Sequence, residues 1–274
     1  AELERLFIDL TAHLLDQGWA QGIRLGAWDN YPGNHIACFY AMREVLAKAG
    51  LARPVAQALM DHFGSHGPGD FAREKPSSSM DGLGYWHREL FACALMFPTP
   101  EEQVQHLRIA ARFLSRAIAE PNTIAPDGCA YHHGGFHYAY ASYNLPRLVQ
   151  VLRTVHDTSF RIDRAAHERL CTYVRALAPT FSKGQQAYNL GMRAGTPMNS
   201  GGVIAVAREL ALMGTPDGKE PLDREMAAIA LWALRDERGA DPPELGKEPY
   251  QSWLAQGIEP AIRHDHITLN GAPM

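Results

Sequence analysis

Cysteine is scarce in this sequence, and the few cysteines show no pairing pattern. The 274 residues include four of them, Cys38, Cys93, Cys129 and Cys171, and no two form a CxxC motif. We therefore expect free thiols, with a disulfide as the alternative that sequence alone leaves open. Cysteine usage accordingly does not indicate the cellular compartment.

Other absences exclude classes of protein. With a net charge of −4 there is no basic excess that points to nucleic acid. No apolar run is long enough to span a bilayer. The N-terminal residues Ala1-Glu2-Leu3-Glu4 lack the basic and apolar regions of a signal peptide. Because the chain starts with Ala rather than Met, we expect that a leader or a preceding domain has been removed.

Alternating strand patterns are nearly absent, whereas apolar residues at helical spacing are frequent. The hydrophobic content of 46% is enough for one large core or two small ones. Four amphipathic stripes predict helices in 104–118, 166–177, 203–211 and 222–233, the second opening after Asp163 as N-cap. Further helices are predicted near 2–17, 34–49, 54–63, 82–97, 144–156 and 248–256.

About ten helices joined by alternately short and long loops predict an all-α fold. Helical hairpins arranged in a ring, an α/α toroid, suit this order, and a bundle or a helical solenoid is the alternative. No domain boundary is visible before residue 262, so we expect a single domain over 1–262. Residues 263–274 form a short, more strand-like tail, which we expect to begin a further domain.

The segment from Asp127 to Tyr140 is the richest in side chains that move protons. Its fourteen residues include three histidines, three tyrosines, three glycines and one aspartate. Imidazoles and phenols are general acids and bases, and glycines let the backbone approach a ligand. We interpret the segment as an active-site loop in front of a helix. Asp127-Gly128 predicts a turn, and the turn at Gly134-Gly135 decides whether His133 and Tyr140 face one another.

The same segment also allows a metal site. His133 and His137 have the HxxxH spacing that places two imidazoles on one face of a helix. However, Gly134-Gly135 argues against a helix, and the motif contains no glutamate. His264-Asp265-His266 is a weaker candidate in the tail. We expect neither a metal nor a cofactor.

Two further segments carry candidate ligand-binding residues. The glycine-rich loop 191–202 holds one cation, Arg193, and ends with Asn199 or Ser200 as the cap of the next helix. It lacks the spacing of a phosphate-binding loop. An arginine framed by small residues can make a bidentate bond to a carboxylate or sulfate.

Aromatic residues beside amides and turn residues are suited to sugars, because rings stack on apolar sugar faces and amides bond to hydroxyls. Trp28 and Asn30 lie in such a segment, and Tyr85, Trp86 and His87 open an amphipathic helix from which we expect them to reach a substrate cleft. A buried tryptophan with a helix cap is the alternative for the first segment.

The reaction indicated by these groups is an elimination. No paired carboxylates are obvious, which argues against a glycoside hydrolase. Histidine, tyrosine and arginine fit proton abstraction at C5 of a uronic acid, with the carboxylate neutralised so that the developing enolate is stabilised. Loss of the C4 oxygen then leaves a C4–C5 double bond.

The run from Pro126 to Tyr140 resembles the catalytic segment of the chondroitin ABC lyases, whose wider family includes chondroitin AC, hyaluronan and xanthan lyases. That segment reads DG-T-A-aromatic-x-H-x-G-x-x-x-x-Y, and His133 and Tyr140 fall on its histidine and tyrosine. Gly191-Met192-Arg193 is similar to the family's Gly-Arg loop. Segments around Trp28 and over 83–96 are similar to its substrate-binding helices. The resemblance covers roughly 20–215.

The resemblance implies an incomplete α/α toroid lining a long cleft, in a secreted or periplasmic enzyme. It implies Tyr140 as general acid, and as base for glucuronate, His133 as base for iduronate, and Arg193 near the scissile oxygen. The partner would be an acidic polysaccharide: chondroitin or dermatan sulfate, or hyaluronan. We expect substrate contacts from Trp28, Asn30, Tyr85, Trp86, His87, His132, His137 and Asn199.

The sequence departs from this family in three ways. The family continues into β-sandwich domains, one of which supplies a catalytic glutamate, so we expect residues 263–274 to begin such a domain and activity without it to be reduced or lost. The residue that neutralises the uronate carboxylate has no firm match, and Asn30 and His87 are the candidates. Gly134 and His137 differ from the family's usual residues. A non-catalytic carbohydrate-binding toroid and an α/α-toroid hydrolase or metalloenzyme are the alternative functions.

Overall fold

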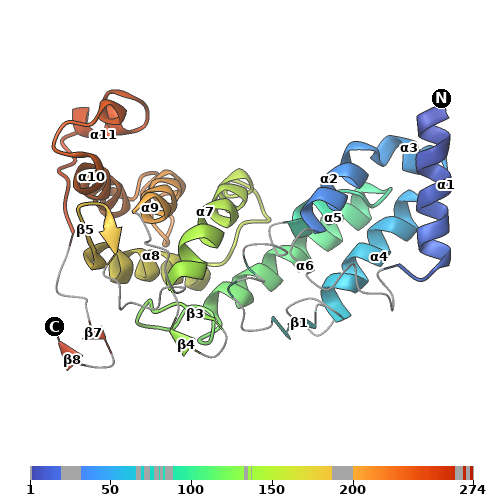
Figure 1. Ribbon diagram of the computed structural model, residues 1–274, viewed down its shortest axis with the longest axis horizontal. Helices are drawn as coiled ribbons and strands as arrows, with labels where there is room; N and C mark the ends of the chain where they lie inside the picture. The colour runs from blue at the N-terminus through green and yellow to red at the C-terminus, as the bar shows by residue number, and fades with distance from the viewer. Residues whose placement is uncertain are drawn as a thin grey trace. The chain divides into compact units, whose positions relative to one another are not determined.

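The fold is almost entirely helical (Figure 1). The computed structural model describes residues 2–19, 32–65, 69–70, 75–76, 80, 83, 89–132, 135–136, 138–186, 200–262, 268–269 and 272–273. Within these residues the only strands are short ones that pair two by two as antiparallel hairpins. These are the elements of an all-α, toroid-like fold, so the predicted fold class is confirmed. The chain divides into two compact units, residues 1–117 and 118–274; the predicted single domain over 1–262 stays a prediction.

The first unit is built on α4, which contacts α1, α3 and α5, while α2 contacts α3 and α5. Its elements are α1 (Glu2–Asp16), α2 (Pro32–Ala41), α3 (Arg43–Lys48), α4 (Ala52–Ser65), β1 (Gly69–Asp70), β2 (Lys75–Pro76), α5 (Leu90–Ala94) and most of α6 (Pro100–Ala119). The helix predicted over 34–49 is therefore two helices, α2 and α3, separated at Met42. In the predicted helix 82–97, Leu90–Ala94 is the part that the structure describes as α-helix.

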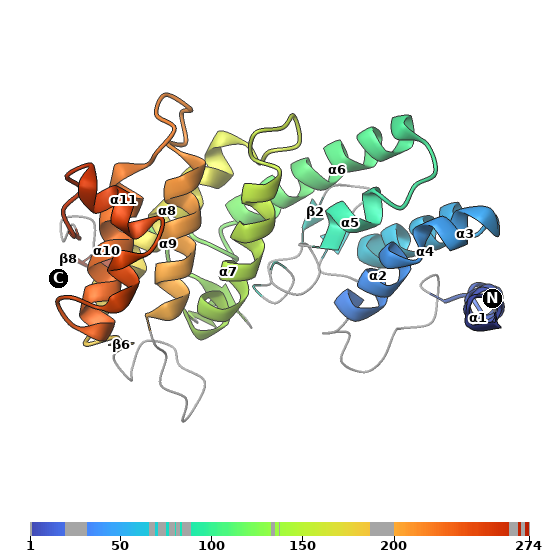
Figure 2. The same ribbon diagram turned by 90° about the horizontal axis from the view of Figure 1, so that it is seen from above.

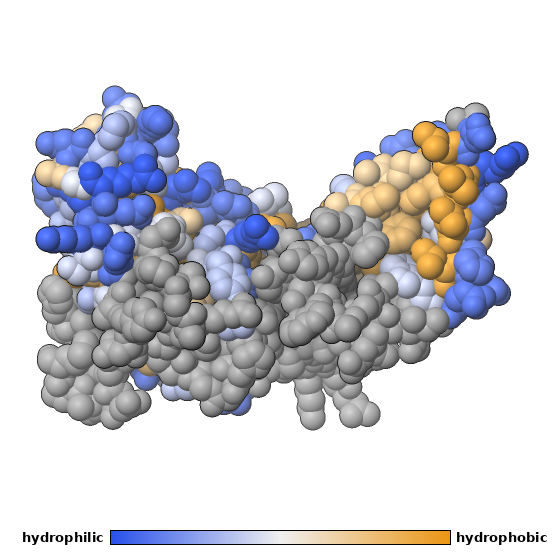
Figure 3. All heavy atoms as spheres, viewed as in Figure 1, coloured by the Kyte–Doolittle hydropathy of each residue, from blue (hydrophilic) through white to orange (hydrophobic). Residues whose placement is uncertain are grey.

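Helix α1 turns an apolar row toward solvent. Four leucines spaced three or four residues apart are 41–80% exposed: Leu3, Leu6, Leu10 and Leu14. Figure 3 shows apolar surface gathered along this helix. Phe7 lies beside this row on the helix and packs inward, with its ring 5.9 Å from that of the buried Phe39. Helix α1 is thus amphipathic, but only part of its apolar side is covered, which is unusual for a helix at a protein surface.

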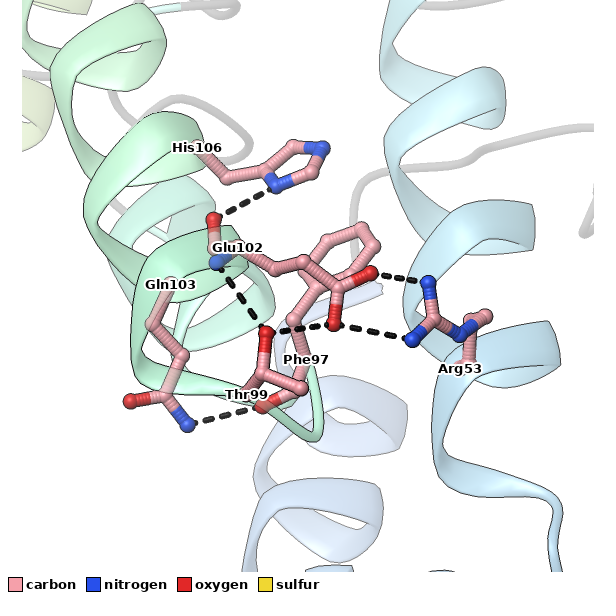
Figure 4. Close-up of polar contacts among 6 residues, drawn as sticks. All are labelled: Arg53, Phe97, Thr99, Glu102, Gln103 and His106. Atoms are coloured by element: carbon pink, nitrogen blue, oxygen red, sulfur yellow. Dashed lines mark hydrogen bonds and ion pairs between the residues drawn. The ribbon is translucent and has the colours of Figure 1, made fainter.

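Side chains around Thr99 fix the start of α6 and tie it to α4 (Figure 4). The Thr99 hydroxyl accepts the Glu102 N–H and donates to the Glu102 carboxylate at 2.9 Å, which satisfies a helix-end N–H that lacks an intrahelical partner. Arg53 of α4 makes a two-bond ion pair with the same carboxylate. Phe97 stacks on His106 with 3.7 Å between ring centroids.

The second unit holds all remaining elements. They are β3 (Tyr131–His132), β4 (Gly135–Phe136), α7 (Tyr138–Thr154), α8 (Arg164–Leu177), η3 (Ala178–Thr180), β5 (Phe181–Ser182), β6 (Gln185–Gln186), α9 (Gly201–Met213), α10 (Arg224–Arg238), η4 (Pro243–Gly246), α11 (Tyr250–Ala255), β7 (Thr268–Leu269) and β8 (Ala272–Pro273). The last pair is antiparallel, with Thr268 opposite Pro273. The strand-like character predicted for the tail is therefore confirmed.

Helix α9 is the centre of this unit. It contacts α7, α8 and α10, and Figures 1 and 2 both show it between α7 and α10. Its predicted stripe is buried, as is the stripe of α8, in which Leu170, Tyr173, Val174 and Leu177 are 0% exposed. Each such side chain stabilises the fold by roughly 1.5–3 kcal/mol relative to an exposed one. The periodic pattern therefore predicted the core correctly.

The N-terminus of α8 follows the predicted chemistry. Asp163 has an extended backbone, and its carboxylate accepts the Ala166 N–H at 2.8 Å. Asp223 caps α10 in the same way, accepting N–H groups of Glu225 and Met226.

All four cysteines are free, as predicted, with Cys38 exposed and the other three buried.

Candidate active site

A short β-hairpin followed at once by a helix forms the centre of the candidate site. Strands β3 and β4 pair antiparallel, with Tyr131 opposite Phe136 and His132 opposite Gly135. Helix α7 begins at Tyr138, two residues after the end of β4 at Phe136. The sequence interpretation placed all of 127–140 in a loop and began the helix near 144. That boundary is wrong, because α7 starts six residues earlier and contains Tyr140 in its first turn.

A tight turn precedes the hairpin. The Asp127 carboxylate accepts the Cys129 N–H at 2.9 Å, and the Ala125 N–H donates to the Cys129 carbonyl at 2.8 Å. Gly128 has a φ of +86°, a conformation that side chains disfavour. The turn predicted from Asp127-Gly128 is confirmed.

This turn is seated on α8. A Cβ atom at Gly128 would lie 2.5 Å from the backbone oxygen of Thr172, so glycine is required by contact as well as by φ. Arg169, one turn earlier on α8, donates to the backbone carbonyl of Ile124. The Tyr131 N–H closes the segment by donating to the Thr123 carbonyl at 2.9 Å. Residues 123–131 are therefore fixed to α8 on the N-terminal side of the hairpin.

Tyr140 is half-buried in the first turn of α7. Its ring lies 5.3 Å from that of Tyr143, with the two rings tilted by 51°. Tyr131, on the first strand of the hairpin, has a pKa raised by burial, with further contributions from Cys129 and Asp127. The Tyr131 phenol consequently stays protonated at neutral pH.

A second hairpin, β5–β6, opens the segment that carries Arg193. Phe181 pairs with Gln186 and Ser182 with Gln185. The turn residues Lys183 and Gly184 donate their N–H groups to the two carboxylate oxygens of Asp236, at 3.0 and 2.8 Å. No local pattern indicates this contact, because Asp236 is more than fifty residues away and lies near the end of an ordinary amphipathic helix.

Ser200 closes the same segment. Its hydroxyl donates to Glu237 Oε2 at 2.5 Å, and its N–H donates to the Gly184 carbonyl at 3.0 Å. Ser200 is the residue before α9, as predicted for a cap, but its side chain makes no capping bond. Ser200 has helical backbone angles (φ −72°, ψ −7°) in place of the extended ones of a side-chain cap, and its hydroxyl points to Glu237.

The start of α9 presses against α7 close to Tyr140. A Cβ atom on Gly202 would lie 2.2 Å from the backbone oxygen of Ser142. Ser142 follows Tyr140 by two residues, and its hydroxyl donates to the Ala139 carbonyl at 2.9 Å. The structure thus brings the end of the Arg193 segment onto the same helical turn that holds Tyr140.

Comparison with known proteins agrees with this arrangement. The family model described as "Lyase, catalytic" matches residues 1–239. The chain belongs to this lyase catalytic family. It is similar to the chondroitin sulfate ABC exolyase of Proteus vulgaris, with 26% identity over 269 residues that make up 96% of this chain and 27% of the relative.

Two further relatives of this lyase-family chain carry related names. The chondroitin sulfate ABC exolyase of Bacteroides thetaiotaomicron is 25% identical over 84% of this chain and 23% of its own length. The chondroitin sulfate ABC endolyase of Proteus vulgaris is 22% identical over 94% of this chain and 26% of its own length. The chain spans about a quarter of the length of these relatives. The resemblance read from the sequence is confirmed.

Most of the site residues predicted from the sequence have side chains outside the part that the structure describes. Outside the residues described with their side chains are His133, Arg193, Trp28, Asn30, Tyr85, Trp86, His87, His132, His137 and Asn199. His132 is described through its backbone in β3. Their predicted roles stay predictions. Tyr140 is the candidate whose side chain and helix are described.

Two cavities of the second unit are lined by residues that lie apart from these candidates in the sequence. A cavity of about 640 Å³ is lined by α8, the start of α10 and the 215–223 segment, and contains the Arg175–Glu225 ion pair. A smaller one of about 260 Å³ is lined in part by His156, Asp163, His167 and Asp217.

Among the residues that the structure describes, no three His, Cys, Asp or Glu side chains gather as metal ligands. In the same part of the chain no helix combines the length and apolarity needed to cross a membrane.

Proposed function

We propose that this chain is the catalytic part of a polysaccharide lyase that cleaves uronic-acid-containing glycosaminoglycans. Chondroitin and dermatan sulfates are the first candidates, and hyaluronan is the next. The observation that carries the proposal is the placement of Tyr140 in the first turn of α7, directly after the β3–β4 hairpin, in a chain matched by a lyase catalytic family over residues 1–239. The names of the similar proteins support the substrate class.

In the proposed reaction a base removes the hydrogen from C5 of the uronate. Its electron pair forms the C4–C5 double bond, the bond from C4 to the glycosidic oxygen breaks, and an acid gives that oxygen a proton. Tyr140 acts as the acid, and also as the base for glucuronate, while His133 is the base for iduronate. Arg193 contacts the scissile oxygen. Asn30 or His87 neutralises the uronate carboxylate, which makes the C5 hydrogen acidic enough to remove.

A phenol suits both proton transfers because it can accept and return one proton within a single site. Tyr140 is only half-buried, so part of the residue is open to solvent. Arginine is suited to contact with the scissile oxygen, since it keeps its charge and presents several donors in a fixed plane. General acid–base catalysis of this kind contributes about 10²- to 10⁴-fold to a rate.

The test is a substrate panel. Because the relatives are about four times longer than the residues compared, the assay uses the protein as its gene encodes it, alongside residues 1–274. Chondroitin, dermatan, hyaluronan, heparin and alginate are each incubated with it while the ultraviolet absorbance of the unsaturated product is followed. A rise with chondroitin or dermatan is expected, and no rise with any polymer rejects the proposal.

The same assay separates the alternatives. Saturable binding of chondroitin without any product indicates a carbohydrate-binding toroid. New reducing ends without a double bond indicate a hydrolase. A lyase signal that a chelator abolishes indicates a metal in the mechanism, in contradiction to the expected chemistry.

A further inference from the structure

We propose that Asp236 and Glu237, neighbours in the last turn of α10, are positioning residues for Arg193. Together they hold the two ends of the segment in which this arginine lies. The proposal rests on the proposed function, since that function gives Arg193 its role. Its structural basis is a set of hydrogen bonds that link both ends of residues 187–199 to one turn of one helix.

Asp236 holds the first end. Its two carboxylate oxygens accept the N–H groups of Lys183 and Gly184 at 3.0 and 2.8 Å, so the β5–β6 turn is bound through both oxygens. Lys183 and Gly184 have φ values of 51° and 72°, which aim consecutive N–H groups to the same side. Hydrogen bonds to an ionised acceptor are about twice as strong as neutral ones. The turn is therefore fixed to α10 before the chain enters 187–199.

Glu237 holds the second end. The Ser200 hydroxyl donates to Glu237 Oε2 at 2.5 Å, and Ser200 is fully buried. A buried hydroxyl that loses its acceptor pays a desolvation penalty, so this bond strongly favours one position of Ser200. The Ser200 N–H also donates to the Gly184 carbonyl at 3.0 Å. The two ends are thus bound to each other as well as to α10.

Close backbone packing reinforces the arrangement. A Cβ atom on Gly184 would lie 2.8 Å from the Cα atom of Glu237, so the turn rests directly on the helix backbone. Beyond Ser200, Gly202 contacts the Ser142 carbonyl of α7. Asp236 and Glu237 consequently fix where the Arg193 segment begins and ends relative to the helix that carries Tyr140. Catalysis that needs an arginine and a phenol around one sugar depends on that placement.

The experiment compares Glu237→Ala and Asp236→Ala with two controls. Glu237→Gln keeps an oxygen that accepts the Ser200 hydroxyl and serves as the conservative variant. Glu225→Ala removes a carboxylate from the opposite end of α10, where it makes a two-bond ion pair with Arg175 and touches neither end of the segment. It lies on the same helix as the first two variants, and it loses two side-chain hydrogen bonds, as Asp236→Ala does.

The first readout is steady-state kinetics on the best substrate of the panel. Either alanine variant at 236 or 237 is expected to lower kcat at least tenfold while KM changes less than threefold, because binding surfaces remain and alignment is lost. Glu237→Gln and Glu225→Ala are expected to stay within threefold of the wild type. An equal loss in Glu225→Ala would mean that any damage to α10 suffices, and would overturn the positioning role.

The second readout does not depend on activity. Trypsin cleaves after arginine, and mass spectrometry identifies cuts after Arg193. Glu237→Ala and Asp236→Ala are expected to speed this cut about tenfold over wild type and Glu225→Ala at a temperature where all are folded. An unchanged rate overturns the proposal even if the protein is a lyase. If the variants are cut faster but the protein has no lyase activity, Asp236 and Glu237 do restrain the segment, and it is the proposed function that is rejected.

Discussion

Two segments of the second unit are built on the same plan yet depend on different parts of the chain. Each has a short antiparallel hairpin followed by a helix, β3–β4 before α7 and β5–β6 before α9, and the two helices pack together. In the first segment α7 begins two residues after β4, so Tyr140 is placed by helix geometry. In the second, residues 187–199 separate hairpin from helix, and α10 holds both ends. A catalytic residue close to a helix start needs little outside help, whereas one in a long connection needs anchors from elsewhere.

The largest effect is expected at Tyr140. Replacing it with phenylalanine removes only the phenol oxygen, so kcat should fall by about 1,000-fold while polysaccharide binding stays within threefold. Kinetics and binding titration measure the two effects. Tyr143→Phe is the matched control, because its ring lies 5.3 Å away on the same helix, and it should remain active. Activity near wild type in Tyr140→Phe would contradict the assigned role.

A substitution at His133 tests whether His133 and Tyr140, both in the first segment, act on different uronates. His133→Ala is expected to lower kcat by roughly 100-fold on iduronate-containing dermatan and by much less on glucuronate-containing chondroitin, since the proposed mechanism assigns Tyr140 as the base for the latter. The ratio of the two rates is the measurement. His156→Ala, at a histidine outside the candidate segments, provides the control. Equal losses on both polymers would remove the division of labour between histidine and tyrosine.

The contact between the two segments can be broken at Gly202. An alanine there would place Cβ 2.2 Å from the Ser142 oxygen, and a backbone carbonyl cannot rotate out of the way. Overpacking of this kind costs about 1–3 kcal/mol. Gly202→Ala should therefore lower the free energy of unfolding by that amount and also reduce kcat, whereas Gly246→Ala, where a Cβ meets nothing within 4 Å, should change neither. Chemical denaturation and kinetics test both statements.

A smaller effect is expected from a fall in pH. It should weaken α8, which contacts the first segment, more than α10, which contacts the second. Burial, together with nearby His156, lowers the pKa of His167 on α8 to about 4, and its Nε2 has no hydrogen-bond partner among the residues that the structure describes. The unfolded chain, with a histidine pKa of about 6.5, binds the proton first, so stability falls as pH drops through the window from 6.5 to 4. The loss between pH 7 and pH 5 is about 2 kcal/mol.

His167→Gln should remove this pH dependence, as measured by urea denaturation at the two pH values. Because α8 supports the first segment through Thr172 and Arg169, hydrogen exchange at pH 5 should increase around 123–131 more than around 183–186. The same increase in both segments would show that the supports are not separate.

The part of this architecture that the sequence predicted is the part governed by local chemistry. The Asp163 cap, the Asp127-Gly128 turn and the stripe of α8 each depend on residues within a few positions of one another. The start of α7 was placed too late because its first turns, Tyr138 to Asn144, are aromatic and small rather than periodic. The roles of Asp236 and Glu237 were missed for another reason: their partners lie 37 to 53 residues away, and a carboxylate at a helix end usually faces solvent.

The apolar row on α1 has a practical consequence for anyone who works with this protein. This exposed apolar surface favours self-association at high concentration; it consists of Leu3, Leu6, Leu10 and Leu14. Deleting the helix is a poor remedy, because Phe7 of the same helix contacts the buried Phe39 and its loss would uncover a new apolar surface. Exchanging the four leucines for glutamine or lysine leaves Phe7 in place and should give the more tractable sample.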